Sequence, residues 1–188
     1  MTIRWTVPPS KGWTYQQLAD VDLDFDWELV DGAVLPRGLT ALWHDQVRDS
    51  LAEPVRRAAP WPYRAIVRTA VLIDERNLLR PDVVVYDRTG VDSASTEHLS
   101  PGDIALVVEV VSPTSRSDDR FRRPGQYAEA GIPSYWRVER SDDGLPVVHE
   151  FRLDEEQGVY LPVAVHEGLL VTAVPFPVEI DLKQVVEL

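Results

Sequence analysis

The sequence has no cysteine among its 188 residues. This absence excludes disulfides, thiolate nucleophiles and zinc sites built on sulfur. Long apolar runs are also missing, since none approaches the ~20 residues that a membrane-spanning helix needs. Residues 1–5 show no basic segment followed by an apolar block, so we expect no secretory signal. These absences together favour a cytoplasmic protein that makes no membrane contact.

Positive charge is scarce, and lysine is almost absent. Lys11 and Lys183 are the only lysines, beside 17 arginines, and 31 acidic residues bring the net charge to −12. An acidic surface repels a phosphate backbone, which excludes non-specific binding of nucleic acid by the whole surface. Any such contact must come from a local basic patch or from metal ions that offset carboxylates. The sequence contains no glycine-rich phosphate loop, no Ser-His-Asp order and no GxSxG motif.

The length and the hydrophobic content of 44% suit a single domain that spans residues 1–188. Apolar periodicity and turn residues predict the secondary structure. The order of elements is neither a strict βαβ alternation nor all-β. It predicts an α/β (α+β) fold with a mixed central sheet, flanking helices and additional antiparallel strands. Helices are expected at 14–20, 40–57, within 116–130 and at 180–186, strands at 27–30, 33–35, 63–73, 83–86, 104–111 and 135–138, and a β-meander at 146–174.

Glu109 is the most informative residue, because it lies in the otherwise apolar run 104–111. A strand buried on both faces explains such a run. A carboxylate at that position is costly unless it is hydrogen-bonded, paired with a cation or bound to a metal. Glu109 is therefore either a metal ligand or catalytic carboxylate, or one half of a buried ion pair with an arginine.

Asp82 follows Pro81 and introduces the apolar segment 83–86. Taken alone, Pro-Asp marks a turn into a strand. Together with Glu109 on a neighbouring strand, however, it forms a pair of carboxylates that could hold Mg²⁺, which takes oxygen ligands and keeps several waters. Such an ion orients a water nucleophile and offsets charge on a scissile phosphate.

Several motifs in this order resemble the Uma2 family of restriction-endonuclease-like proteins. They are Trp27-Glu-Leu-Val-Asp-Gly32, His44, Arg80-Pro-Asp-Val83, Val108-Glu-Val-Val-Ser-Pro113, Asp119, Tyr127-Ala-Glu-Ala-Gly-Ile-Pro133 and Tyr135-Trp136, within about residues 14 to 165. The resemblance implies a PD-(D/E)XK nuclease fold, Mg²⁺ or Mn²⁺ as cofactor, DNA as substrate and a homodimer. It implies Asp82 and Glu109 as metal and catalytic carboxylates, Glu28 as a further ligand, and His44 and Asp119 as accessory residues.

The lysine of the usual nuclease pattern is missing, because Val111 stands two residues after Glu109. The family resemblance moves that position into the following helix, where this sequence has Arg123. Arginine keeps its proton, so it is a poor general base, but it can stabilise charge on a phosphate. Arg116, Arg120 and Arg122 cluster beside it. They are either a patch that binds nucleic acid or a solvated face with local ion pairs.

Two functions follow from these residues. The first is a metal-dependent endonuclease that hydrolyses DNA with Arg123 as a third catalytic residue. The second is a catalytically inactive nuclease fold that acts as a binding or interaction module, which the Arg123 replacement and the acidic balance favour. In a third interpretation Glu109 merely pairs with Arg123 or another arginine in a structural network.

Overall fold

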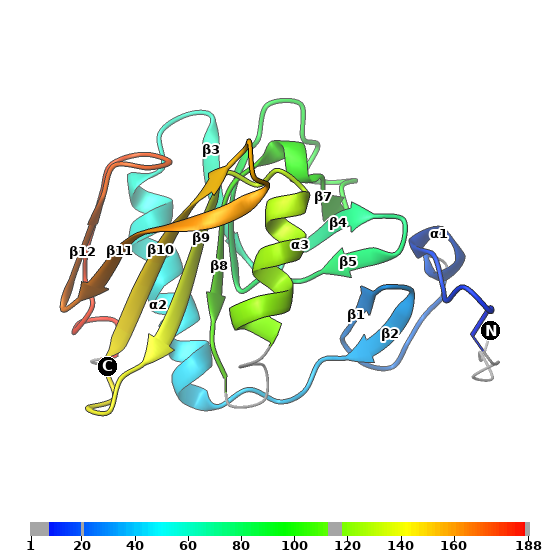
Figure 1. The fold of residues 1–188 in the computed structure, drawn as a ribbon, viewed down its shortest axis with the longest axis horizontal. Coiled ribbons are helices and arrows are strands. Elements are labelled where there is room, and N and C mark those ends of the chain that lie inside the picture. Colours follow the sequence, from blue (N-terminus) through cyan, green and yellow to red (C-terminus); the bar gives the residue numbers. More distant parts are fainter. Residues whose placement is uncertain (1–7, 20, 113–117, 187–188) are drawn as a thin grey trace.

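The structure is a computed structural model that describes residues 8–19, 21–112 and 118–186, without the side chains of Asp118 and Asp119. Its central feature is a six-stranded sheet (Figure 1). Every neighbouring pair is antiparallel except β8 and β9, so the sheet is mixed, as the sequence predicts. In sheet order the strands are β11 (Val159–Glu167), β10 (Pro146–Asp154), β9 (Ser134–Arg140), β8 (Ile104–Val110), β6 (Val83–Asp87) and β3 (Tyr63–Val67).

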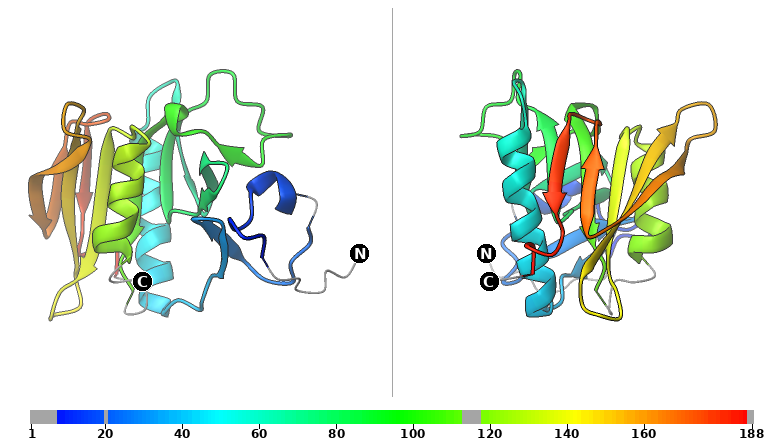
Figure 2. Two further views of the ribbon diagram at one scale, coloured as in Figure 1. Left: turned by 45° about the vertical axis from the view of Figure 1, so that its right-hand side comes forward. Right: turned by 90° about the vertical axis from the view of Figure 1, so that its left-hand side faces the viewer.

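One helix covers each face of this sheet, α2 (Leu42–Ala58) on one and α3 (Arg123–Glu129) on the other (Figure 2). Successive residues of β8 alternate between them. Val108 packs in a cluster with residues of α2, whereas Val107 packs in a cluster with Tyr127 of α3. Both faces of the strand are therefore buried, which explains the continuous apolar run around Glu109.

A second sheet of five short strands lies beside the first. It is antiparallel except for the parallel pair of β4 and β7. In sheet order its strands are β2 (Ala33–Pro36), β1 (Trp27–Val30), β5 (Asn77–Leu79), β4 (Ala70–Asp74) and β7 (His98–Leu99).

The remaining elements are short. The hairpin of β12 (Leu169–Thr172) and β13 (Val178–Asp181) buries Leu170, Val178 and Ile180 in the α2 cluster. A π-helical turn, η2, leads directly into α3. No helix in the described parts of the chain is long and apolar enough to cross a membrane. The other short elements are α1 (Tyr15–Leu18), the 3₁₀ turn η1 (Pro101–Asp103) and η2 (Asp118–Arg122).

Two sequence predictions of secondary structure are wrong. Residues 63–73 form two strands in different sheets, because the chain turns at Arg68, whose φ of 55° breaks the extended backbone. Residues 180–186 form no helix. Residues 178–181 are strand β13, paired with β12, and a series of turns follows it. The short strands β5 and β7 were not predicted, since three and two residues are too few for a periodic pattern.

Candidate active site

Asp82 and Glu109 lie side by side where β6 begins and β8 ends. Val83 pairs with Val108 in the antiparallel register, and Asp82 and Glu109 are the next residues beyond this pair. The backbone N–H of Val110, the residue after Glu109, donates to Asp82 Oδ2 at 2.8 Å, which holds Asp82 at this end of β8. Both residues are buried, with exposed fractions of 2% and 3%. The structure thus brings Asp82 and Glu109 to one cavity, which both residues line.

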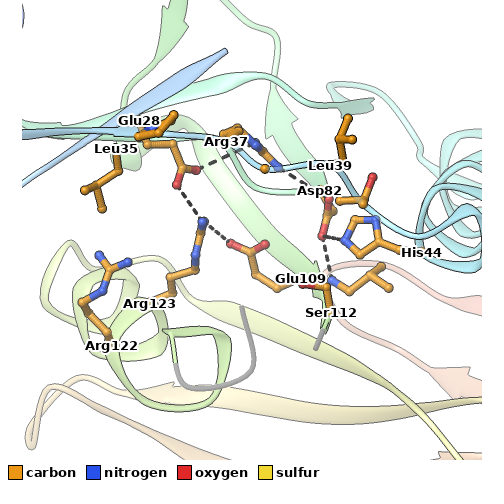
Figure 3. A pocket seen from close by; sticks show the side chains of 14 residues that line it. Glu28, Leu35, Arg37, Leu39, His44, Asp82, Glu109, Ser112, Arg122 and Arg123 are labelled. Atoms are coloured by element: carbon orange, nitrogen blue, oxygen red, sulfur yellow. Dashed lines mark hydrogen bonds and ion pairs between the residues drawn. The ribbon is translucent and has the colours of Figure 1, made fainter. Parts of the chain in front are cut away.

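Arg123, the first residue of α3, binds two carboxylates at once (Figure 3). Its Nη1 donates to Glu109 Oε1 at 2.9 Å, and its Nη2 donates to Glu28 Oε2 at 2.7 Å. Glu28 Oε1 accepts the backbone N–H of Arg80 at 2.7 Å. A guanidinium presents donors in a fixed fork, which suits two acceptors in one plane. Arg123 therefore compensates two buried negative charges and fixes their positions.

Tyr127 is a further contact of Glu109 that the sequence reasoning missed. Its hydroxyl donates to Glu109 Oε1 at 2.6 Å, and the residue is fully buried. Burial raises the pKa of Tyr127 well above its usual value, and the negative charge of Glu109 raises it further. Tyr127 is therefore a neutral donor. It lies four residues after Arg123, a helical spacing that places both side chains on one face and could have revealed it.

Asp82 has one satisfied and one unsatisfied oxygen. Its Oδ2 accepts the backbone N–H of Val110 at 2.8 Å and lies 3.2 Å from Nε2 of His44. Its Oδ1 is buried and accepts no hydrogen bond from the part of the chain that the structure describes. The nearest cation to this atom is Nη2 of Arg37, at 4.0 Å. A buried acceptor without a donor is uncommon and points to a ligand.

His44, from the first turn of α2, bonds to Asp82 inside the molecule. Burial lowers the pKa of His44, but the hydrogen bond to Asp82 and the charge of Asp82 outweigh it, so the pKa is raised above 6.5. Its other ring nitrogen, Nδ1, lies 3.5 Å from Asp45 Oδ1. The accessory position implied by the family resemblance is thus next to a predicted metal ligand.

A cavity of about 350 Å³, the carboxylate cavity, is lined by the side chains of Glu28, Arg37, His44, Asp82, Glu109 and Arg123 (Figure 3). Asp82 and Glu109 suit Mg²⁺ or Mn²⁺, because they offer paired carboxylates with a buried oxygen, Asp82 Oδ1, that lacks a donor. Glu28 fits this role poorly, since Arg80 and Arg123 engage both of its oxygens. Within the described residues, no group of three or more His, Asp or Glu side chains is placed to hold a metal.

The predicted arginines separate in the structure. Arg122 lines the carboxylate cavity, and its Nη1 lies 3.2 Å from Gln126 Oε1. Arg120 lies outside this cavity and forms an ion pair with Glu139 on β9. Arg116 and the side chain of Asp119 lie outside the described residues. Arg37, which also lines the cavity, was missed, because a lone arginine between Pro36 and Gly38 carries no local signal.

Comparison with solved structures gives the class of protein. A crystal structure of "a putative nuclease belonging to DUF820" from Anabaena variabilis ATCC 29413 matches with a TM-score of 0.63, 12% sequence identity and coverage of 86% of this chain and 89% of that chain. At this identity the likeness shows the fold, which is the nuclease-like α/β fold that the sequence predicts.

The sequence then gives the family. A profile of Uma2, described as "Putative restriction endonuclease", matches residues 14–183. Since this is most of the chain, the protein belongs to the Uma2 family. Among the curated proteins none matches it.

Proposed function

We propose that this protein is a metal-dependent endonuclease that hydrolyses phosphodiester bonds in DNA. The observation that carries the proposal is the buried pair of Asp82 and Glu109 at adjacent strand ends, with Asp82 Oδ1 lacking a hydrogen-bond donor in the described residues. Asp82 and Glu109 would hold Mg²⁺ or Mn²⁺. When bound, such an ion supplies an activated water and offsets charge on the phosphate.

The chain's own residues prepare this site. Arg123 and Tyr127 both donate to Glu109 Oε1, which fixes the carboxylate in one orientation. Val110 N–H and His44 do the same for Asp82 Oδ2. Arg123 remains protonated at neutral pH, so it acts as a fixed positive charge beside the phosphate rather than as a general base.

The alternative function is a binding module with a nuclease fold and no catalysis. It is favoured by Arg123, whose guanidinium bridges Glu28 and Glu109 and already compensates their charge. In this alternative, binding of a partner requires neither Asp82 nor Glu109, and Glu109 belongs to a structural ion-pair network.

Nicking of a supercoiled plasmid with Mg²⁺ or Mn²⁺ tests the proposal. We expect activity that EDTA abolishes and that Asp82→Asn and Glu109→Gln each lose. The matched control is Glu150→Gln, because Glu150 on β10 is as buried as Glu109, at 3% exposed, but lies outside the carboxylate cavity. Cleavage that survives in both Asp82→Asn and Glu109→Gln would reject the two-carboxylate mechanism. Absence of metal-dependent cleavage in the unaltered protein would favour the binding module.

A further inference from the structure

A second cavity, of about 360 Å³, lies beside the carboxylate cavity. The two share Arg37, Gly38, Leu39 and Thr40, the segment between β2 and α2, so this segment forms the wall between them. Only two aspartates line the second cavity, so positive charge is in excess there although the chain as a whole carries −12. We call it the arginine pocket, because four arginines line it: Arg37, Arg48, Arg68 and Arg80.

Asp45 holds two of these arginines in place. Its Oδ1 accepts from Arg48 Nη1 at 2.6 Å and from Arg68 Nη2 at 3.2 Å, and also from the hydroxyl of Thr40 at 2.8 Å. One carboxylate thus positions two guanidiniums, and it can neutralise only one of them. Arg48 is further paired with Asp49, whereas Arg68 keeps 52% of its side chain exposed. Arg68 is therefore positioned and still accessible to a ligand.

Arg80 supplies a cation without a carboxylate. Its guanidinium forms no ion pair and no hydrogen bond within the described residues, and its Nε is buried. The buried carboxylates nearby are already engaged, since Glu28 accepts from Arg123 and from the Arg80 backbone. A guanidinium without a carboxylate partner leaves its positive charge uncompensated, which favours an anion in the pocket that Arg80 lines.

The backbone at Arg68 is held in an unusual conformation. Its φ of 55° lies in the left-handed region, which is uncommon for a residue other than glycine. Arg68 N donates to the carbonyl of Asp82 at 3.1 Å, so this turn is fixed directly against the carboxylate site. Backbone strain of this kind concentrates at functional sites. Here it turns the chain between the two sheets and places Arg68 at the pocket.

The two cavities are connected through side chains as well as through a shared wall. His44 bonds to Asp82 on one side and approaches Asp45 on the other, and Asp45 binds Arg48 and Arg68. Arg37 lies 4.0 Å from Asp82 and also lines the arginine pocket. A ligand that spans the wall would therefore contact the carboxylate cavity at one end and the guanidinium groups of the arginine pocket at the other.

We propose that the arginine pocket binds one phosphodiester group of a nucleic acid strand, adjacent to the phosphodiester group that lies at Asp82 and Glu109. The identity of the strand rests on the proposed function, whereas the preference for a phosphate rests on the guanidiniums themselves. Planar guanidinium forks match phosphate oxygens, and such contacts hold the register of a strand without reading its sequence. Its lining includes none of the arginines Arg116, Arg120 and Arg122 that the sequence predicts as a nucleic-acid patch.

The test is equilibrium binding of a short fluorescein-labelled DNA strand in EDTA, measured by anisotropy over a series of salt concentrations. We expect Arg68→Gln and Arg80→Gln each to weaken binding about 5- to 10-fold and to reduce the salt slope by about 1, as loss of one phosphate contact should. Arg68→Lys keeps the charge but not the planar fork, so its affinity should fall between those of the wild type and Arg68→Gln. The matched control is Arg57→Gln, which removes the same charge from an exposed position on α2, 73% exposed, and should change binding less than about 2-fold.

The outcomes separate this proposal from the proposed function, because binding in EDTA requires no cleavage. Loss of binding in both pocket variants supports the pocket even if the protein never nicks DNA. If Arg68→Gln and Arg80→Gln bind DNA as tightly as Arg57→Gln and their unfolding curves are unchanged, the proposed phosphate pocket is wrong even if nicking is robust. The strand is tested with and without a 5′-phosphate. If removing the 5′-phosphate weakens binding as much as Arg68→Gln does, the pocket binds a terminal phosphate, and the proposal of an internal phosphodiester is overturned.

Discussion

At the scale of single residues, Arg123 stabilises two buried carboxylates, and its removal should be costly. Arg123→Gln leaves Glu28 and Glu109 without their shared cation. Breaking a buried ion pair by removing one partner typically costs about 3–5 kcal/mol, and we expect a loss in that range in the free energy of unfolding. Urea denaturation measures it, with Arg57→Gln as the exposed control that should change stability by less than about 0.5 kcal/mol.

Arg123→Lys should fall between the wild type and Arg123→Gln. A single ammonium restores the charge but does not present the planar fork that reaches both Glu28 Oε2 and Glu109 Oε1. If Arg123→Gln unfolds at the same urea concentration as the wild type, other groups compensate the two carboxylates and the described network does not stabilise the fold.

Tyr127 gives a second prediction at this scale. Tyr127→Phe removes only the hydroxyl that donates to Glu109 Oε1. Hydrogen bonds to charged groups contribute about 1.5–3 kcal/mol, so we expect a loss of about 2 kcal/mol in the free energy of unfolding. Tyr63→Phe is the control, since the Tyr63 hydroxyl forms no hydrogen bond within the described residues. Equal stability of the two variants would contradict the importance of this contact.

Glu109 could be predicted from the sequence because it breaks a strong apolar pattern, and Asp82 because it introduces a second apolar strand. A carboxylate inside an apolar strand has few physical explanations. Two apolar strands that follow each other in the sequence are expected to lie side by side in the sheet. Arg37 and Arg80 could not be predicted as site residues, because they reach the site only through the packing of the second sheet against the first. Nothing in the neighbouring sequence distinguishes them from the other arginines.

At the scale of elements, Asp45 fixes the start of α2 to the turn between β3 and β4. Burial raises the pKa of Asp45, but the hydrogen bond from Thr40 and the charge of Arg48 outweigh it, so the pKa is lowered below 3.8. A carboxyl with a lowered folded-state pKa contributes stability that is present above its unfolded pKa and is lost as pH falls through the folded value. Asp45→Asn should therefore be less stable than the wild type at neutral pH.

The pH dependence of that difference is the check. Thermal unfolding of both proteins should give melting temperatures that differ at pH 7, and the difference should shrink as pH falls from about 4, near the unfolded pKa of an aspartate, through the lowered pKa of folded Asp45. A difference that stays constant down to acid pH would show that the substitution acts through packing and not through the charge of Asp45.

The elements that the sequence predicted wrongly share a cause. Residues 63–73 are rich in β-branched residues, yet the chain turns at Arg68, where the contact of its backbone with Asp82 decides the conformation. Residues 180–186 have apolar spacing compatible with a helix, yet Ile180 is drawn into a hairpin with Leu170 and buried in the α2 cluster. Tertiary contacts override local preference in both cases. The long strands and α2 were predicted correctly because their patterns run for several turns or repeats.

At the scale of the whole molecule, two adjacent cavities differ in charge. Three carboxylates and three arginines line the carboxylate cavity, whereas two aspartates and four arginines line the arginine pocket. The carboxylates lie at the ends of β6 and β8 in the first sheet, with Glu28 contributed by β1 of the second. The arginine pocket lies where the second sheet and α2 meet. The proposed phosphate contact would therefore let an acidic protein bind a polyanion at one place while its remaining surface repels it. The site is a product of both sheets, so its stability depends on how they pack together.

Metal binding provides the last prediction, because it separates a metal site from a structural ion-pair network. A ligand that binds only the native state raises its stability, by about 2.7 kcal/mol at roughly 100 times its Kd. We expect Mg²⁺ or Mn²⁺ to raise the melting temperature of the wild type, measured by calorimetry at constant ionic strength. Cations also screen the net charge of −12, and this general effect should stabilise every variant alike.

Two variants therefore isolate the specific effect. Asp82→Asn removes a proposed ligand and should lose the additional rise, while Glu150→Gln, equally buried but outside the cavity, should keep it. If the wild type and Asp82→Asn respond equally to both metals, Glu109 serves only to pair with Arg123, and the nuclease fold is a binding module. If only Asp82→Asn fails to respond, the unsatisfied oxygen of Asp82 is a metal ligand, and Arg123 is a fixed cation beside a working centre.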